Sequence, residues 1–311
     1  MTDNKAPSSH SDLTRRKVLL AGGAAVTAVG LAGSSALNAA AGEAAAATRA
    51  TTVESCYMLT SELVEGPYYI DADKLRRDVT EDQDGIPLTL TLKVIDAESC
   101  RPLRNAAVDI WHCNAVGVYS GYGDSGNGGG GPAPTGPPPS GMPTGEPPTD
   151  GPGQGGGHQE PTDDERFLRG TWHTDRNGQV AFRTVFPGWY QGRCVHIHVK
   201  VHVDGKWTDS GYEGGRTCHT GQLFFDEDSV SLTESVEPYS TNTVTRTTLD
   251  EDGIYPGNGH ESGLLHLRYD TKHIARGVRA QLTLGVDPSA TNDGQDGPRP
   301  TASQPPSAAA S

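Results

Sequence analysis

Basic residues are scarce in this chain. Its 311 residues include 25 lysines and arginines against 39 aspartates and glutamates, so the formal net charge at pH 7 is −14. Binding to nucleic acid requires a basic surface that neutralises phosphates. The shortage of positive charge therefore argues against nucleic acid as a partner, and an excess of negative charge is typical of a protein that stays in solution.

Cysteines are also few, and none of them form a CxxC pair. The five are Cys56, Cys100, Cys113, Cys194 and Cys218. A zinc ribbon or a thioredoxin-like redox site therefore has no support. In an oxidising compartment we expect one or two disulfides and a thiol left over, but the sequence does not determine the pairing.

Long apolar runs are absent except for one near the N-terminus. Arg15 and Arg16 precede an apolar run from Val18 to about Leu37, and an alanine-rich stretch follows. This order is typical of an export signal, and the arginine pair indicates the twin-arginine route. We predict a cleaved signal over residues 1–48 and a mature protein in the cell wall, the periplasm or the extracellular space, with no stable membrane insertion. An ordinary secretory signal or a membrane anchor are the alternatives, because about 20 apolar residues can span a bilayer.

Composition divides the remaining chain into one folded domain with an insertion and a tail. Residues 51–286 are predicted to form the domain. Within it, residues 124–160 are almost only glycine, proline, serine, threonine and a few acids, which cannot pack a core and predict a flexible surface insertion. Residues 287–311 lack the apolar side chains that could offset ordering entropy, so this tail is predicted to be disordered.

Alternation of apolar and polar residues predicts strands. The five segments with this pattern or with a continuous apolar run are residues 88–94, 106–111, 179–185, 194–203 and 278–286. Asn177-Gly178 predicts a tight turn before the third of them. Only weak helix candidates occur, near Ser61 and Lys74. Short strands separated by turns favour a sandwich or a barrel, and the fold class we predict is an all-β sandwich of mixed and antiparallel strands with long loops.

The most informative strand contains two histidines. His196 and His198 lie two residues apart, so they share one face of a strand with Cα atoms about 6.7 Å apart. At that spacing both imidazoles can converge on one metal ion. The same pattern also occurs on exposed polar strand faces. His202 continues this face, but about 13 Å of strand separates it from His198, so we leave it out of the site.

Two segments together resemble the intradiol ring-cleavage dioxygenases, the family of catechol and protocatechuate dioxygenases. The first contains Asp109-Ile110-Trp111 and then Gly117-Val118-Tyr119; the second contains Pro187-Gly188-Trp189-Tyr190, then Arg193, then His196-Ile197-His198. Weaker matches at residues 65–69, 167–170, 174–178 and 220–225 extend the resemblance from Glu65 to Phe225. Four candidate ligands in register, two tyrosines and two histidines, are more specific than any single motif.

The resemblance implies a β-sandwich enzyme that binds non-haem Fe(III) through Tyr119, Tyr190, His196 and His198. With O2 it would cleave a small aromatic diol between its hydroxyls and form a cis,cis-muconate-type product. Phenolate and imidazole suit iron, and a cation favours deprotonated tyrosine. Tyr190 would also take a substrate proton, Arg193 would stabilise negative charge on the ring, and Gln222 would lie beside the substrate. The alternatives are a surface salt bridge for Arg193 and a hydrogen bond to a neighbour for Gln222.

Two departures from the family leave other functions open. The insertion follows Tyr119 directly, and the long N-terminal dimerisation helices are missing, so neither the pocket mouth nor the oligomeric state is determined. A copper or zinc enzyme is one alternative, with ligands recruited from His112, His173, His219 and His260. A non-catalytic β-sandwich that binds cell wall or carbohydrate is another, because fold does not determine function. The sequence also does not distinguish among catechol, a carboxylated catechol and hydroxyquinol as substrate.

Overall fold

The computed structural model describes residues 56–71, 74–123, 159–259 and 262–294. The predicted export signal, residues 124–158 of the predicted insertion, and residues 295–311 of the predicted tail lie outside this part of the chain. Among the described residues, no helix is both long enough and apolar enough to cross a membrane.

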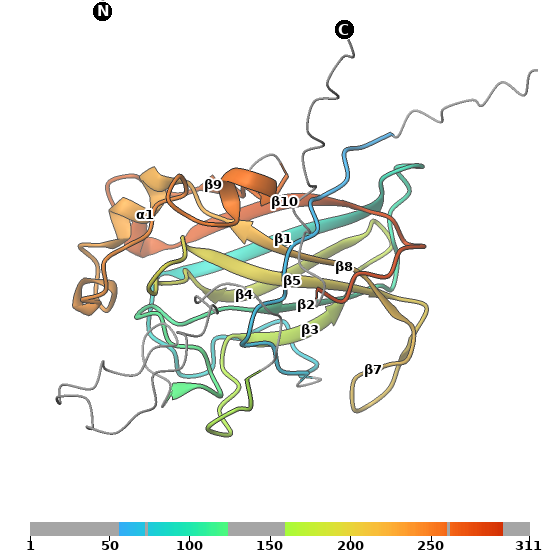
Figure 1. Ribbon diagram of the computed structural model, residues 1–311, viewed down its shortest axis with the longest axis horizontal. Helices are drawn as coiled ribbons and strands as arrows, with labels where there is room; N and C mark the ends of the chain where they lie inside the picture. The colour runs from blue at the N-terminus through green and yellow to red at the C-terminus, as the bar shows by residue number, and fades with distance from the viewer. Residues whose placement is uncertain (1–55, 72–73, 124–158, 260–261, 295–311) are drawn as a thin grey trace, which may run out of the picture. The chain divides into compact units, whose positions relative to one another are not determined.

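The described residues form two four-stranded sheets and a short hairpin (Figure 1). One sheet has the order β4 (Gln179–Val185), β1 (Pro87–Asp96), β10 (Val278–Val286) and β9 (His266–Arg268). The other has the order β3 (Arg169–His173), β2 (Ala107–Trp111), β5 (His196–Val203) and β8 (Arg216–Phe224). The hairpin pairs β6 (Lys206–Trp207) with β7 (Tyr212–Glu213). Only β1 and β10 run parallel among these strand pairs, so the predicted all-β sandwich of mixed and antiparallel strands is confirmed.

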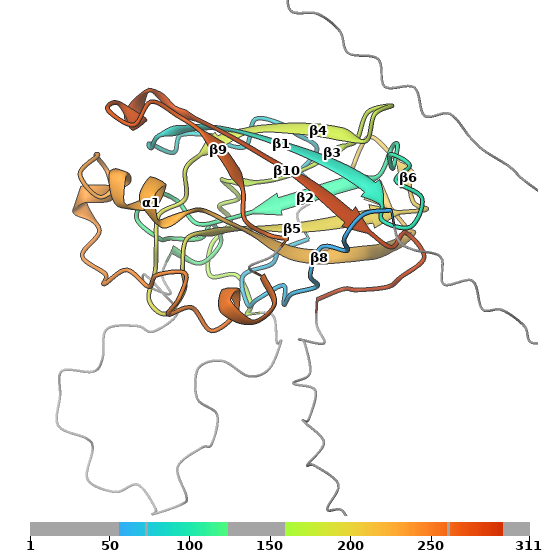
Figure 2. The ribbon, with the colours of Figure 1, turned by 90° about the horizontal axis from the view of Figure 1, so that it is seen from above.

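The first sheet has one buried and one exposed face, and we call it the open sheet. Leu88, Leu90 and Leu92 of β1 are buried, whereas Thr89 and Lys93 between them are exposed. Strand β4 shows the same alternation, and β10 shows it over its first four residues; the bounds of both strands are those that their sequence patterns predicted. The inward side chains pack against the second sheet and form the main hydrophobic core (Figure 2).

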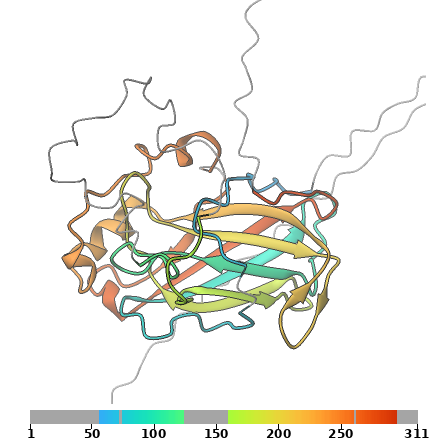
Figure 3. The ribbon, with the colours of Figure 1, turned by 60° about the horizontal axis from the view of Figure 1, so that its bottom comes forward.

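The second sheet is buried on both faces, and we call it the covered sheet. Ile197, Val199 and Val201 of β5 lie in the main core, as their alternation predicted. The opposite face of β5 is buried as well, because residues 56–71, which we call the crossing segment, pass over it (Figure 3). Leu63 N donates a hydrogen bond to Thr220 O of the edge strand β8, which fixes this crossing segment to the sheet.

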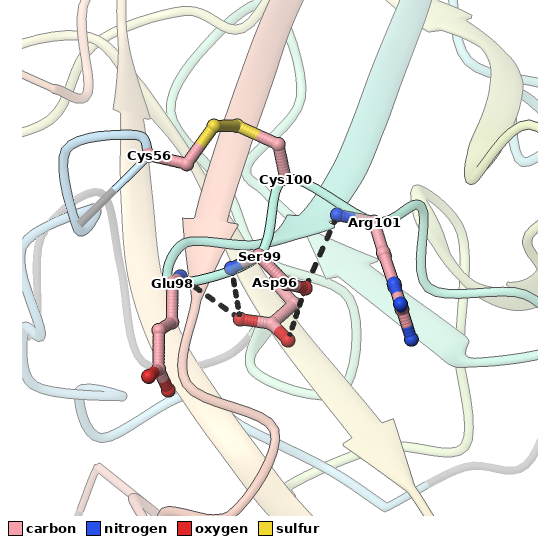
Figure 4. The surroundings of a disulfide bond; sticks show 6 residues. All are labelled: Cys56, Asp96, Glu98, Ser99, Cys100 and Arg101. Carbon is pink, nitrogen blue, oxygen red and sulfur yellow. Dashed lines mark hydrogen bonds between the residues drawn. A yellow bond between two sulfur atoms is a disulfide. The ribbon is translucent and has the colours of Figure 1, made fainter. Parts of the chain in front are cut away.

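A disulfide between Cys56 and Cys100 holds the start of the crossing segment (Figure 4). Cys100 lies in the turn after β1, where Asp96 Oδ1 accepts hydrogen bonds from the amides of Glu98 and Ser99. The other three cysteines are free and buried. The structure therefore has one disulfide, within the predicted range, but three thiols remain.

Helix α1 (Glu227–Thr233) was missed from the sequence because it is only seven residues long. Asp226 caps its N-terminus by accepting a hydrogen bond from Ser229 N, and acidic side chains in the first turn suit the helix dipole. The weak helix candidates near Ser61 and Lys74 were wrong. Both segments pair with strands instead, since Lys74 O accepts a hydrogen bond from Thr171 N at the edge of the covered sheet.

Residues 287–294, which the sequence assigns to the disordered tail, make specific hydrogen bonds. Asn292 N donates to Thr217 O, and Thr220 Oγ1 donates to Asn292 O. This part of the prediction was wrong, because backbone pairing to the edge strand β8 compensates for the lack of apolar side chains. Similarly, Gln159 at the end of the predicted insertion donates its amide hydrogen to Pro67 O.

Candidate functional site

The structure brings together the side chains of Tyr119, Tyr190, His196 and His198. The histidines project from the same face of β5, and their Nε2 atoms lie 3.1 Å apart. Tyr190 Oη lies 3.3 Å from His196 Nε2. The ring of Tyr119 lies 5.7 Å from that of Tyr190 and 6.2 Å from that of His198, centroid to centroid. All four side chains are buried, so two loops and one strand form a compact donor cluster.

Glycines allow the two tyrosine loops to approach each other. Gly117 adopts a φ of 86° in the turn after β2, where the side chain of Asn114 accepts hydrogen bonds from two following amides. A Cβ atom at Gly188 would lie 2.2 Å from the carbonyl oxygen of Ala115. Only glycine allows this approach, which explains why it precedes Tyr190.

A hydrogen bond made by His196 directs the lone pair of its Nε2 atom into the cluster. His196 Nδ1 lies 2.7 Å from the carbonyl oxygen of Cys194. Because a carbonyl only accepts, Nδ1 carries the hydrogen and Nε2 presents its lone pair to the cluster. Burial lowers the pKa of His196 to about 3 and lowers the pKa of His198 well below its usual value. Both imidazoles are therefore neutral at physiological pH, as metal ligation requires.

The charge of Arg193 is not enough to offset the burial of the two tyrosines. The hydroxyl of Tyr119 is buried and makes no hydrogen bond with that part of the chain. Burial raises the pKa of both phenols above the usual value. A bound cation would reverse this shift, because it stabilises the phenolate. Two phenol oxygens and two imidazole nitrogens form a set that suits iron, so the donor chemistry fits the ion that the family resemblance implies.

Aromatic rings fix the orientation of two of these donors. Trp111 of β2 stacks on His198 with an interplanar angle of 10° and a centroid distance of 4.8 Å. Tyr68 of the crossing segment stacks on Tyr119 at 4.8 Å. Gly66 of the same segment lies so close to His198 that a Cβ atom there would meet the ring at 3.3 Å. The crossing segment therefore forms one wall of the cluster.

Arg193 and Gln222 lie beside the cluster and bind each other. Arg193 Nη2 donates to Gln222 Oε1, and Gln222 Nε2 donates to Val64 O of the crossing segment. Gln222 also lies opposite His198 in the β5–β8 register. Burial opposes the charge of Arg193, but the proximity of Tyr190 and Asp252 outweighs it and raises the pKa of the guanidinium. Arg193 is therefore a fixed cation at the edge of the cluster.

Asp252 holds Arg193 in place, and sequence reasoning missed it. Its Oδ2 accepts hydrogen bonds from Arg193 Nε and Cys194 N, each at 2.8 Å. Its Oδ1 accepts from the amides of Ile254 and Tyr255. Burial alone would raise the pKa of this carboxyl, but Arg193 and the amides lower it overall, so the carboxylate stays charged. It lies in an acidic loop, where the sequence does not distinguish it from its neighbours.

The histidines proposed as alternative metal ligands do not gather into a site in the described part of the chain. His112 has both ring nitrogens engaged, by Cys113 O and by Thr184 Oγ1. His219 Nδ1 pairs with Glu62, and His173 stacks on Trp172. His260 lies outside the described residues. Within these residues, no group of three or more histidine, cysteine, aspartate or glutamate side chains could hold a metal ion.

Known proteins that resemble this chain are dioxygenases. A dioxygenase family model matches residues 64–128, a range that includes Tyr119. The solved structure of an intradiol ring-cleavage dioxygenase from Tetranychus urticae is 31% identical; the match covers 76% of this chain and 98% of that chain, with a TM-score of 0.59. The chain belongs to the intradiol ring-cleavage dioxygenase family.

A curated relative, catechol 1,2-dioxygenase of Acinetobacter baylyi, is 27% identical over 171 residues. The match covers 47% of this chain and 43% of that enzyme, so this chain aligns with less than half the length of that relative.

Proposed function

We propose that this protein is an intradiol dioxygenase that uses non-haem Fe(III) and O2 to cleave a catechol-type ring between its two hydroxyls, giving a cis,cis-muconate-type product. The observation that carries the proposal is the buried convergence of two phenols and two neutral imidazoles in a member of this family. Tyr119, Tyr190, His196 and His198 would hold the iron.

When bound, Fe(III) would supply a hard Lewis acid that favours the deprotonated forms of the tyrosines and of the diol. The protein fixes the orientation of the two imidazole ligands before the ion binds. His196 keeps its lone pair directed inward because Cys194 O holds the hydrogen on Nδ1. His198 keeps its ring plane because Trp111 stacks on it. These contacts limit the reorganisation that substrate binding would otherwise require.

Tyr190 is the residue best placed to take a proton from the substrate. Its hydroxyl lies 3.3 Å from His196 Nε2, and the charge of Arg193 partly offsets the effect of burial on the pKa of the phenol. As a phenolate, Tyr190 Oη can accept a proton from one diol hydroxyl, so that one side chain serves first as ligand and then as base.

Arg193 is placed to stabilise negative charge that develops on the aromatic ring. Asp252 and Gln222 hold the guanidinium on two sides, so its position does not change as charge develops. Fixed charges of this kind lower a barrier because they need no reorganisation during the reaction. Gln222 would contribute by holding Arg193 and by lining the substrate side of the cluster.

The visible absorption spectrum of the iron-loaded protein tests the proposal directly. A tyrosinate-to-Fe(III) charge-transfer band should appear, and anaerobic catechol should shift it. Substitution Y119F or Y190F should change the band and lower turnover at least about 100-fold, in the range of removed catalytic groups. The matched control is Y212F in the β6–β7 hairpin, which should leave both unchanged. A colourless folded protein that contains stoichiometric iron would contradict the ligand set.

We also propose that the chain is exported through the twin-arginine route. The support is the Arg15-Arg16 pair before the apolar run, together with the Cys56–Cys100 disulfide, which is stable in an oxidising compartment. Replacing both arginines with lysine should retain the protein inside the producing cell. Unchanged export of this variant, measured by fractionation, would indicate a different route.

A further inference from the structure

The solvent face of the open sheet carries positive but no negative side chains. Strand register aligns one row across all four strands: Arg183 of β4, Thr89 of β1, Arg279 of β10 and Arg268 of β9. The side chains that continue this face along the strands are Ala181, Thr91, Gln281, His266, Gln179, Lys93 and Thr283. No aspartate or glutamate stands on it within the described strands, although acids outnumber bases in the chain by 39 to 25.

Two of these arginines lie opposite each other on adjacent antiparallel strands. Arg268 and Arg279 are direct register partners, are exposed, and form no ion pair with the described residues. Like charges in this position destabilise a sheet. Arg183 does pair with Asp78, but both side chains are largely exposed, so water screens the pair. The two facing arginines therefore do not stabilise the fold. Such a pair is expected on a face that binds an anion, because the anion would offset the repulsion.

A hollow of about 450 Å³ opens at this end of the face. It is lined by Pro87, Thr89, Arg268, Tyr269, Arg276, Gly277, Val278 and Arg279. Three guanidinium groups and one aromatic ring therefore surround a concave surface without a carboxylate in its lining. Arg276 Nη1 lies 3.4 Å from Asp270 Oδ2, whereas Arg268 and Arg279 form no ion pair within the described part of the chain.

We propose that this hollow and the adjoining sheet face bind an acidic polysaccharide, a chain of sugars that bear carboxylates. The planar guanidinium of arginine matches a carboxylate through two parallel hydrogen bonds. Thr89, Thr91 and Gln281 provide neutral hydrogen-bonding groups that suit sugar hydroxyls, and Tyr269 provides a ring. The open and covered sheets are the two layers of the sandwich (Figure 2), and the donor cluster lies on the outer side of the covered sheet. Occupation of the open face would therefore leave the proposed catalytic site free.

Charge density favours a polysaccharide over nucleic acid. Duplex DNA carries one negative charge for about every 1.7 Å of its axis. A protein with a net charge of −14 repels such a dense polyanion outside the small basic face. A polyuronate carries one charge per sugar and offers hydroxyls between charges, which matches a face where threonine and glutamine side chains lie beside the arginines.

The test is affinity electrophoresis of the full chain in gels that contain polygalacturonate, with fully methyl-esterified polymer as the neutral probe. The protein should be retarded by the acidic polymer alone. The variant R268S/R279S should lose affinity at least about tenfold, which corresponds to about 1.4 kcal/mol. The control R101S/R104S removes the same charge from exposed arginines between β1 and β2 and should bind like the unmodified protein. Both variants should cleave catechol at the unmodified rate.

Three results would overturn the proposal: equal retardation by the esterified polymer, equal loss in both double variants, or unchanged binding by R268S/R279S. Single-stranded DNA at the same ionic strength is the last probe. Equal or tighter binding to DNA would assign the face to a different partner. Since the readout is binding rather than turnover, failure here leaves the proposed dioxygenase activity unaffected.

Discussion

The open and covered sheets each have four strands but differ in what lies on their outer faces. On the open sheet, polar side chains face water and alternate with the leucines of the core. On the covered sheet, His196, His198, Lys200 and Gln222 face outward but are buried beneath the crossing segment. Burying polar groups costs free energy unless they are hydrogen-bonded, paired or bound to a metal. A polar strand face that is nevertheless covered therefore indicates a function, and here it carries the donor cluster.

The largest expected effect concerns the buried ion pair between Lys200 and Glu65. Substitution K200M leaves the Glu65 carboxylate buried without its ammonium, which should cost about 3–5 kcal/mol in the free energy of unfolding. The same substitution at Lys93 on the open sheet should change it by less than about 0.5 kcal/mol. Urea denaturation measures both. The double variant E65Q/K200M should recover most of the loss, and a double variant as unstable as K200M would show that the charge is not the cause.

The disulfide should stabilise the covered face more than the open one. Cys56 and Cys100 are separated by 44 residues, and replacing both with alanine should lower the free energy of unfolding by about 4 kcal/mol. Hydrogen exchange should localise the loss. The amide of Leu63 in the crossing segment should exchange faster at sub-denaturing conditions, while amides between β1 and β10 should keep their relative protection. If amide exchange became equally faster in the crossing segment and between β1 and β10, the disulfide would not stabilise the covered face more than the open one.

Replacing a buried and an exposed glutamine compares how much each contributes to the free energy of unfolding. Substitution Q222A on the covered sheet removes the hydrogen bonds that Gln222 makes with Val64 O and Arg193 Nη2, and it should cost about 1–3 kcal/mol. Substitution Q281A on the exposed face of β10 should cost less than about 0.5 kcal/mol. Thermal or urea unfolding of the two variants gives the comparison, and similar losses would mean that burial does not distinguish the two positions.

The smallest effect is a pH dependence confined to the covered sheet. Burial lowers the pKa of His202 to about 4, and this pKa lies below the unfolded value of about 6.5. The unfolded state then binds more protons, so stability falls as pH falls from 6.5, by roughly 1.5 kcal/mol at pH 5. Substitution H202Q should remove this part of the slope in the iron-free protein. Substitution H266Q, on the exposed face of β9, should retain the full slope.

The carboxyl of Asp109, in the same buried region, should give stability the opposite dependence on pH. Burial raises the pKa of Asp109 to about 7, so its contribution to stability is lost as pH rises from about 4 to 7. The histidine effect is therefore measured as the difference between H202Q and the unmodified protein rather than from the total slope.

The sequence by itself determined the features that depend on near neighbours. Alternation at i and i+2 predicted β4 and β10 with their observed bounds, and it placed His196 and His198 on one face of β5. The family motifs pointed to Tyr119 and Tyr190 as the other two donors. The fold class and the gathering of the four donors followed from these local patterns together with the family resemblance.

Only the tertiary structure decided which polar residues would be buried and with what partners. Lys200 pairs with Glu65 across 135 positions of sequence, and Arg193 pairs with Asp252 across 59. Alternation along a strand shows which residues form its apolar face and which form its polar face. It does not show whether a distant segment of the chain will cover the polar face. Pairing at such separations depends on chain packing rather than on local periodicity. For this reason Asp252, the crossing segment and the backbone pairing of residues 287–294 could not be found from the sequence.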